Sequence, residues 1–168
     1  YCMAGLPAEE GKIKALPEKI YDALCAYADV VLVEADGSRG MPIKYPAEYE
    51  PVIPENAEEI HIVTGLSALG KSLKEVSHRK QLVEQCLEIS EDGIIMPEHL
   101  QKLLQKGYIE PLQKKFPEKE IKICPGQANS LYERVAAALL REQKDVSLIN
   151  QVWFQEKQKL IVLGGGHV

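Results

Sequence analysis

The sequence predicts an α/β fold with a mainly parallel sheet and flanking helices. Short apolar runs typical of strands alternate with amphipathic segments typical of helices, which is the order that βαβ units produce. Residues 30–33 form one such run, V-V-L-V, and two acids follow it, Glu34 and Asp36. Because ligands of open α/β sheets bind beyond the carboxyl ends of the strands, this run also predicts the position of a site.

The first third of the chain predicts a helix, a strand and a long loop. Residues 17–28 have helical spacing, with Pro17 at the start. Its expected inner face consists of Ile20, Leu24 and Tyr27. The strand at 30–35 follows directly. Residues 40–55 carry four prolines, too many for a helix or an inner strand, and predict an extended ordered loop. We expect four residues to anchor it: Ile43, Tyr45, Tyr49 and Val52.

The rest of the chain continues the alternation. Further strands are expected at 59–64, 121–124 and 159–163. Further helices are expected at 72–89, 97–105 and 130–142, and Gly107 closes the second of these. We therefore predict one α/β domain over 1–149, a linker over 150–159, and the start of a second domain over 160–168.

Composition narrows the class of protein. The chain has 168 residues, of which 45% are hydrophobic and 27% charged, enough for a domain with a sizeable core. A net charge of −5 argues against binding to nucleic acid or to a membrane surface. No apolar run is long enough to cross a bilayer. The four cysteines are scattered without a C-x-x-C pair, which suits a reducing cytoplasm and predicts core packing. Nothing indicates the oligomeric state.

Glu34 and Asp36 are candidate metal ligands. Side chains two positions apart on a strand point to the same side. An acid at the end of such a strand commonly holds Mg²⁺ beside a nucleotide phosphate, often through water. The alternative is a strand end whose acids are simply solvated, and these residues alone favour neither interpretation.

Residues 65–72 read G-L-S-A-L-G-K-S, a literal match to the P-loop pattern, after a strand and before a helix. A working P-loop would place Lys71 on the β- and γ-phosphates and Ser72 on magnesium. Two observations count against it. The acid pair lies upstream rather than downstream, and bulky leucines stand where backbone N–H groups would crowd the phosphate. We expect a loop and helix start with Lys71 in solvent.

Arg39 and Lys44 are candidate anion ligands, together with the turn residues Gly37 and Ser38 that follow the acids. The two cations could neutralise a phosphate or another anion. They could equally pair with carboxylates of the next segment, Glu48 or Glu50.

His78 and Arg79 lie in or near the first turn of an expected helix and are candidates for the same site. His78 is a candidate base or ligand, and its alternative is a capping or surface role. His61 alternates with isoleucines, so we expect it to have a structural role. We expect His99 to lie on the surface of a helix. The spacing supports no Ser/His/Asp or Cys/His catalytic set.

Three segments together suggest a family: V-V-L-V-E-A-D-G-S-R-G-M-P-I-K, then P-A-E-Y-E-P-V-I-P, then V-T-G-L-S-A-L-G-K-S-L. This order resembles the YqeC family, which comprises accessory proteins of selenium-dependent molybdenum hydroxylases. His78-Arg79, the M-P-E-H-L segment and the strand at 121–124 fall in the same order. The resemblance covers roughly residues 1–150.

The resemblance implies an α/β protein related to P-loop NTPases, whose glycine-rich phosphate loop precedes the segment that corresponds to this chain. Asp36, with Glu34, would then stand at the Walker B position and organise Mg²⁺ for ATP or GTP. It also implies that 65–72 is a different, downstream family segment. Relatives tend to have an asparagine-containing segment like GTPase base-reading motifs near residues 125–129, and P-G-Q-A-N departs from it.

The end of the chain, L-I-V-L-G-G-G-H-V, has the opening of a Rossmann fingerprint. It is similar to the start of the nucleotide-binding domain of XdhC-type xanthine dehydrogenase accessory proteins. The alternative is a short strand with a glycine tail. Because the chain starts at Tyr1 and stops inside this motif, we expect a piece of a longer protein that lacks the N-terminal phosphate loop.

Two functions from different classes follow. The first is a cytoplasmic accessory factor, a Mg²⁺-dependent NTPase when complete, with a molybdenum hydroxylase or its cofactor-maturation proteins as partners. The second is a non-catalytic carrier or docking module for a cofactor precursor or client enzyme. Turnover that depends on Asp36 would favour the first function.

Overall fold

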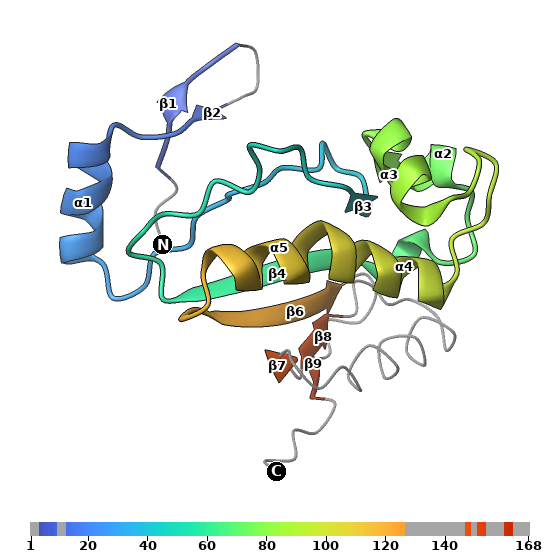
Figure 1. Ribbon diagram of the computed structural model, residues 1–168. Helices are drawn as coiled ribbons and strands as arrows, with labels where there is room; N and C mark the ends of the chain where they lie inside the picture. Colours follow the sequence, from blue (N-terminus) through green and yellow to red (C-terminus); the bar gives the residue numbers. More distant parts are fainter. Residues whose placement is uncertain (1–3, 10–12, 127–146, 149–150, 154–159, 163–168) are drawn as a thin grey trace. The chain divides into compact units, whose positions relative to one another are not determined.

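The computed structural model describes residues 4–9, 13–126, 147–148, 151–153 and 160–162 (Figure 1). It is a mixed α/β fold of helices and short parallel strand pairs, as the sequence predicts in outline. The chain divides into two compact units, residues 1–34 and 35–168, a boundary that the sequence does not predict. None of the helices in the described ranges is both long and apolar enough to cross a membrane.

The first unit contains a small hairpin and one helix. Strands β1 (Leu6–Pro7) and β2 (Ile13–Lys14) pair antiparallel, and α1 spans Glu18–Tyr27. The helix is confirmed, but its predicted inner face is wrong, because no residue of α1 is buried and Tyr27 is 92% exposed. Within the described residues of this unit, there is no second helix or larger sheet to cover that face.

The predicted strand at residues 30–33 is also wrong. The backbone there has no regular structure, and Val30 and Leu32 are 76% and 91% exposed. A strand is stabilised by hydrogen bonds to its neighbours and by burial of its side chains. The apolar composition of this run is compatible with a strand, but no described segment pairs with it.

The second unit is built on a parallel sheet. Strand β4 (Glu59–Gly65) pairs with β6 (Glu120–Gly126), with Ile60 opposite Ile121 and Ile62 opposite Ile123, and β6 pairs with β7 (Ser147–Leu148). Burial alternates along both long strands, since side chains point to opposite faces in turn. The strands predicted at 59–64 and 121–124 are confirmed.

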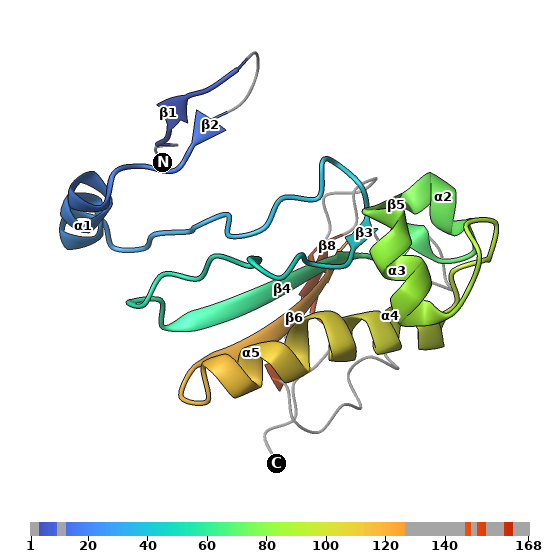
Figure 2. The ribbon, with the colours of Figure 1, turned by 45° about the horizontal axis from the view of Figure 1, so that its top comes forward.

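One long helical segment covers a face of this sheet (Figure 2). It consists of α4 (Pro97–Leu104), the π-helical turn η2 (Gln105–Ile109) and α5 (Glu110–Lys115). The prediction that Gly107 ends a helix is therefore wrong. A Cβ on Gly107 would lie 3.2 Å from the Pro46 side chain and 3.3 Å from the Tyr45 ring. We infer that this glycine permits close packing against the 40–55 loop rather than serving as a helix stop.

The segment 72–89, predicted as one helix, is split by a strand. A 3-10 turn, η1 (Leu66–Ala68), leads to α2 (Leu73–Val76), and α3 spans Lys80–Leu87. Between them, β5 (Ser77–His78) pairs parallel with β3 (Ile43–Lys44). Pairing with a distant segment overrides the local helical pattern, as tertiary contacts commonly do. The loop predicted at 40–55 therefore contains a short strand.

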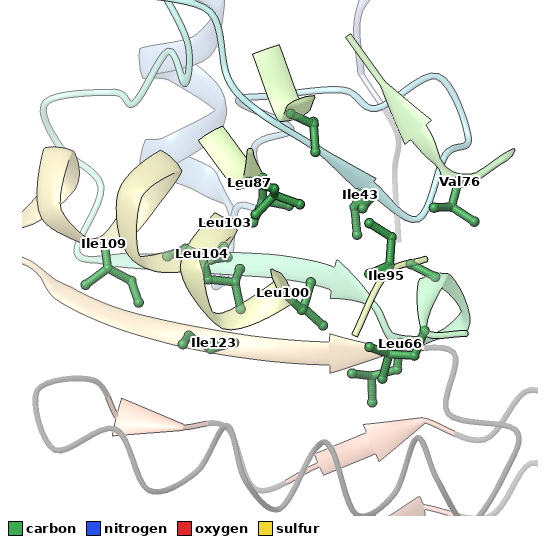
Figure 3. Packing of buried hydrophobic residues seen from close by; sticks show 14 of the residues in the cluster. Ile43, Leu66, Val76, Leu87, Ile95, Leu100, Leu103, Leu104, Ile109 and Ile123 are labelled. Atoms are coloured by element: carbon green, nitrogen blue, oxygen red, sulfur yellow. The ribbon is translucent and has the colours of Figure 1, made fainter. Parts of the chain in front are cut away.

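The core of the second unit lies between the helical segment, the sheet and α2–α3. Figure 3 shows Leu100, Leu104 and Ile109 directed toward the sheet that carries Ile123. The largest side chains with less than 2% exposure come from every described layer. They are Leu66, Leu73, Val76, Val83, Ile95, Leu100, Leu103, Leu104, Ile109 and Ile123.

Two short strands are described near the end of the chain. Strands β8 (Gln151–Trp153) and β9 (Leu160–Val162) pair antiparallel, so three residues of the predicted linker form a strand. Strand β9 matches the strand predicted at 159–163. The helix predicted at 130–142, the asparagine-containing segment and the glycine tail lie outside the described residues, apart from Pro125 and Gly126 at the end of β6.

Candidate functional site

Parallel pairing of β3 with β5 brings most of the predicted site residues together. Lys44 lies opposite His78 in this pair, and Arg79 follows at the end of β5. Segments more than 30 positions apart in the sequence thus meet at one place. Of the predicted anion ligands, both Lys44 and the pair His78–Arg79 lie there.

Lys44 is the centre of the cluster. Its side chain is 3% exposed, although lysine is among the residues least often fully buried. The ammonium contacts Asp36 Oδ1, donates to the Gly37 carbonyl oxygen at 2.9 Å and donates to Glu50 Oε2 at 2.8 Å. Of the two alternatives for Lys44, the structure therefore shows pairing with Glu50, and all three ammonium donors have acceptors.

Asp36 is held from both sides. Its Oδ1 accepts from Lys44, and its Oδ2 accepts a hydrogen bond of 3.0 Å from the Tyr108 hydroxyl on η2. Burial, together with the nearby charge of Asp36 and this hydrogen bond, raises the pKa of Tyr108 far above its usual value. The phenol therefore stays protonated and remains a donor to Asp36 across the physiological range.

Glu50 joins Lys44 to Arg79. It accepts from the Ala47 amide at 3.1 Å and from Arg79 Nη2 at 2.8 Å, and Arg79 Nη2 also lies 3.2 Å from the Tyr49 hydroxyl. Burial acts to raise the pKa of Glu50, but the hydrogen bonds from Lys44 and Ala47 and the nearby cations outweigh it and hold that pKa below its usual value. Glu50 is thus an ionised link between two cations.

Arg39 and Arg79 both adopt left-handed backbone conformations. Arg39 has φ 54° and Gly40 has φ 77°, in a turn closed by a hydrogen bond from the Met41 amide to the Ser38 carbonyl oxygen, while Arg79 has φ 58°. Left-handed residues with a Cβ cost roughly 1–2 kcal/mol each. Such outliers cluster at functional sites, and here two of the three non-glycine examples among the described residues are arginines of one cluster.

His78 lies among these cations. Its burial lowers its pKa, and the charges of Arg39, Lys44 and Arg79 lower it further, against a smaller opposing effect of Glu50. The imidazole is therefore neutral at pH 7. A neutral imidazole can donate one hydrogen bond and accept another, so it can serve either as a base or as a ligand to an anion.

The predicted residues fall into two sets. Asp36, Gly37, Ser38, Arg39, Lys44, His78 and Arg79 all belong to the second unit, in or beside the cluster. Glu34 belongs to the first unit and is exposed. Since residues 30–34 form no strand, the geometry that would aim Glu34 and Asp36 to one side is not present.

A magnesium site does not fit the side chains that the structure places here. Both oxygens of Asp36 are engaged, one by the Lys44 ammonium and the other by Tyr108. Among the described residues there is no group of three His, Cys, Asp or Glu side chains that could hold a metal ion. A magnesium ion at Asp36 would stand next to a cation that already occupies the carboxylate.

The P-loop-like segment 65–72 is packed into the core, and most of its backbone donors are already bonded within the protein. Leu66 and Ala68 are fully buried, and Leu69 is 6% exposed, so the loop is filled by its own side chains. Five of its backbone N–H groups donate to acceptors within the protein, and they are those of Gly65, Leu69, Gly70, Lys71 and Ser72. Ser72 also donates through its hydroxyl to Glu75. Lys71 is exposed, as predicted.

Burial keeps two cysteines of the second unit in the thiol form. Burial raises the pKa of Cys124 to about 11 and raises that of Cys86. Both are thiols at pH 7, and Cys86 packs against the core, which agrees with the predicted packing role.

Tyr108 and Tyr49 are the site residues that the sequence does not predict. Tyr108 reaches Asp36 from 72 positions away, and no local pattern marks it. Tyr49 and Val52 are two of the four predicted anchors of the loop, but they are 71% and 67% exposed. Ile43 is buried and Tyr45 packs against the core, so half of the predicted anchors are confirmed.

Comparison with known proteins gives the family. Residues 1–81 match the family model described as YqeC protein. Over 72 residues the chain is 42% identical to the Escherichia coli (strain K12) protein named "Uncharacterized protein YqeC", a match that covers 42% of this chain and 28% of that protein. No solved structure matches the chain. The match to the YqeC family lies in residues 1–81, which carry every cluster residue except Tyr108.

Proposed function

We propose that this chain is part of an accessory factor for the maturation of selenium-dependent molybdenum hydroxylases, and that it binds an anion at Arg39, His78 and Arg79. The anion we propose is the phosphate group of a nucleotide, ATP or GTP. The pathway rests on the YqeC resemblance, and the ligand class rests on the geometry of the cluster. The partners would be the hydroxylase or its cofactor-maturation proteins.

One observation carries the anion proposal. The Arg79 Nε–H is buried and has no hydrogen-bond partner among the described residues. Buried donors are nearly always satisfied, and an exception calls for a water, an ion or a ligand. An anionic oxygen beside Arg79 would accept from this donor and would also lie near His78, which feels the charges of both arginines.

The charges of the cluster support the same proposal. Lys44 and Arg79 carry two positive charges, and Asp36 and Glu50 carry two negative charges that contact them. Arg39 forms no ion pair with the described residues and adds one uncompensated positive charge to the cluster. In a chain of net charge −5, this local excess favours a small anion.

The test is titration calorimetry of the 168-residue chain with ATP and with GTP. We expect binding that weakens roughly tenfold or more in Arg39→Ala, because a hydrogen bond to a charged group contributes about 1.5–3 kcal/mol. Arg39 is exposed, so this change should not affect folding. Lys71→Ala is the matched control, since it removes another exposed cation and should bind as the wild type does.

A carrier or docking role is the second candidate. It is favoured by Tyr49 and Val52, two large apolar side chains exposed on the proline-rich loop. If nucleotide binds but is not hydrolysed, and the hydroxylase partner binds in a manner sensitive to Tyr49→Ser, the carrier role is supported. Nucleotide hydrolysis that is lost in Asp36→Asn would support the NTPase role instead.

A further inference from the structure

We infer that the Lys44 ammonium occupies a cage of oxygen atoms at Asp36 in which a divalent cation would otherwise bind. The neighbouring anion site therefore works without a metal ion. The cage consists of Asp36 Oδ1, the Gly37 carbonyl oxygen at 2.9 Å and Glu50 Oε2 at 2.8 Å. Carboxylate and carbonyl oxygens are the ligands that hard divalent cations prefer. Here they converge on one ammonium group.

The burial of Lys44 distinguishes this arrangement from a surface ion pair. Its side chain is 3% exposed, and those of Asp36 and Glu50 are 10% and 15% exposed. The pair Lys74–Asp92, by contrast, is 49% and 71% exposed. Two carboxylates side by side in a buried place need a counter-charge, and the lysine side chain supplies it permanently.

The outer oxygens of the cage are fixed as well. Tyr108 donates to the second oxygen of Asp36, and Arg79 donates to the second oxygen of Glu50. Both carboxylates are thereby aimed at Lys44, in the way that outer hydrogen bonds orient the ligands of metal sites. A divalent ion added to this cage would face the Lys44 ammonium directly and the Arg79 guanidinium close by.

This inference makes the proposed function more specific: the ligand is a metal-free anion rather than a magnesium–nucleotide complex. The part that concerns the anion rests on the proposed function. The positive charge that magnesium brings to phosphates in nucleotide-binding proteins would come instead from Arg39 and Arg79, and Glu50 of the cage holds Arg79 in place. The Lys44 statement itself can be tested without any anion.

The first experiment compares anion binding with and without magnesium. Inorganic phosphate, ATP and GTP are titrated into the wild-type chain in EDTA and in MgCl₂. We expect affinity in EDTA to equal or exceed that in MgCl₂. Binding that requires magnesium and is lost in Asp36→Asn would overturn the inference but leave anion binding intact. An absence of binding under every condition would overturn the proposed function. The statement about Lys44 would then be tested by the second experiment alone.

The second experiment empties the cage. Lys44→Ala leaves the two carboxylates and the carbonyl with space between them, whereas Lys44→Met removes the charge but keeps the space filled. We expect millimolar Ca²⁺ or Mn²⁺ to raise the melting temperature of Lys44→Ala in a concentration-dependent manner, since a ligand of the folded state stabilises it. The wild type and Lys44→Met should not respond.

Two controls make the result specific. Lys74→Ala, which removes a lysine from an exposed ion pair, should show no metal response, and adding Asp36→Asn to Lys44→Ala should abolish the response. A melting temperature of the wild type that rises with millimolar Mn²⁺ would overturn the inference, and this measurement needs no variant that could misfold. A folded Lys44→Ala without any metal response would also overturn it.

Discussion

The Tyr108 hydroxyl donates a hydrogen bond of 3.0 Å to Asp36 Oδ2 across 72 positions of the chain. Tyr108 lies on the π-helical turn η2, and π turns inside α-helices often occur at functional sites. The glycine before it, Gly107, permits this turn to approach the Tyr45 ring closely. The helix that covers the sheet is thus also the element that orients the acid of the candidate site.

Tyr108→Phe should lower the free energy of unfolding by about 1.5–3 kcal/mol, the contribution of a hydrogen bond to a charged group. The ring remains, so core packing is kept and only the donor to Asp36 is removed. Urea unfolding measures the change. Tyr27→Phe is the control, because Tyr27 is 92% exposed and its loss should stay within about 0.5 kcal/mol. Equal effects of the two changes would contradict a role for this hydrogen bond.

The substitution Ser72→Ala tests whether Ser72 caps helix α2 or belongs to a phosphate-binding loop. Ser72 stands before α2, where its backbone N–H bonds to Glu75 at 3.1 Å and its hydroxyl donates to the same carboxylate. Loss of a cap of this kind costs about 1 kcal/mol, which thermal or urea unfolding can measure. Nucleotide affinity should not change. A variant of unchanged stability that lost magnesium–nucleotide binding would show that the segment 65–72 acts as a phosphate loop.

We expect the free energy of unfolding to decrease on mild acidification because of His78. Its pKa is lowered in the folded state, chiefly by burial and then by Arg39, Lys44 and Arg79, so the unfolded state binds a proton first as the pH falls. Stability is therefore full above about pH 6.5, the unfolded value, and decreases below it toward the folded pKa. Glu50 acts at lower pH, since its lowered pKa makes its contribution complete above about pH 4.5.

The measurement is the free energy of unfolding between pH 7.5 and 5.5 for the wild type and for His78→Gln. The variant should show a smaller decrease than the wild type over this range. His61→Gln is the comparison, because His61 pairs with Glu59 on β4 and lies outside the cluster. If wild type and His78→Gln decline in parallel, the charges around His78 do not act as the structure indicates.

Local pattern predicts the elements whose burial follows a simple period. The alternation of Glu59, Ile60, His61 and Ile62 predicts a half-buried strand, and β4 is that strand with the isoleucines inside. The same kind of reasoning is wrong at residues 30–33, where apolar composition does not determine whether a neighbouring strand is present. It is also wrong at Gly107, where packing against the Tyr45–Pro46 loop outweighs the tendency of glycine to end a helix.

The sequence by itself determined the mixed α/β class, the two long strands of the sheet, the match of residues 1–81 to the YqeC family, and the charged residues that are candidates for the site. Only the tertiary structure decided that Lys44 is buried between two carboxylates and that Tyr108 completes the cluster. The reason is physical. Periodicity reports which face of an element is apolar, but the role of a charge depends on which distant charges and donors packing brings within hydrogen-bond reach, and on how much water it removes.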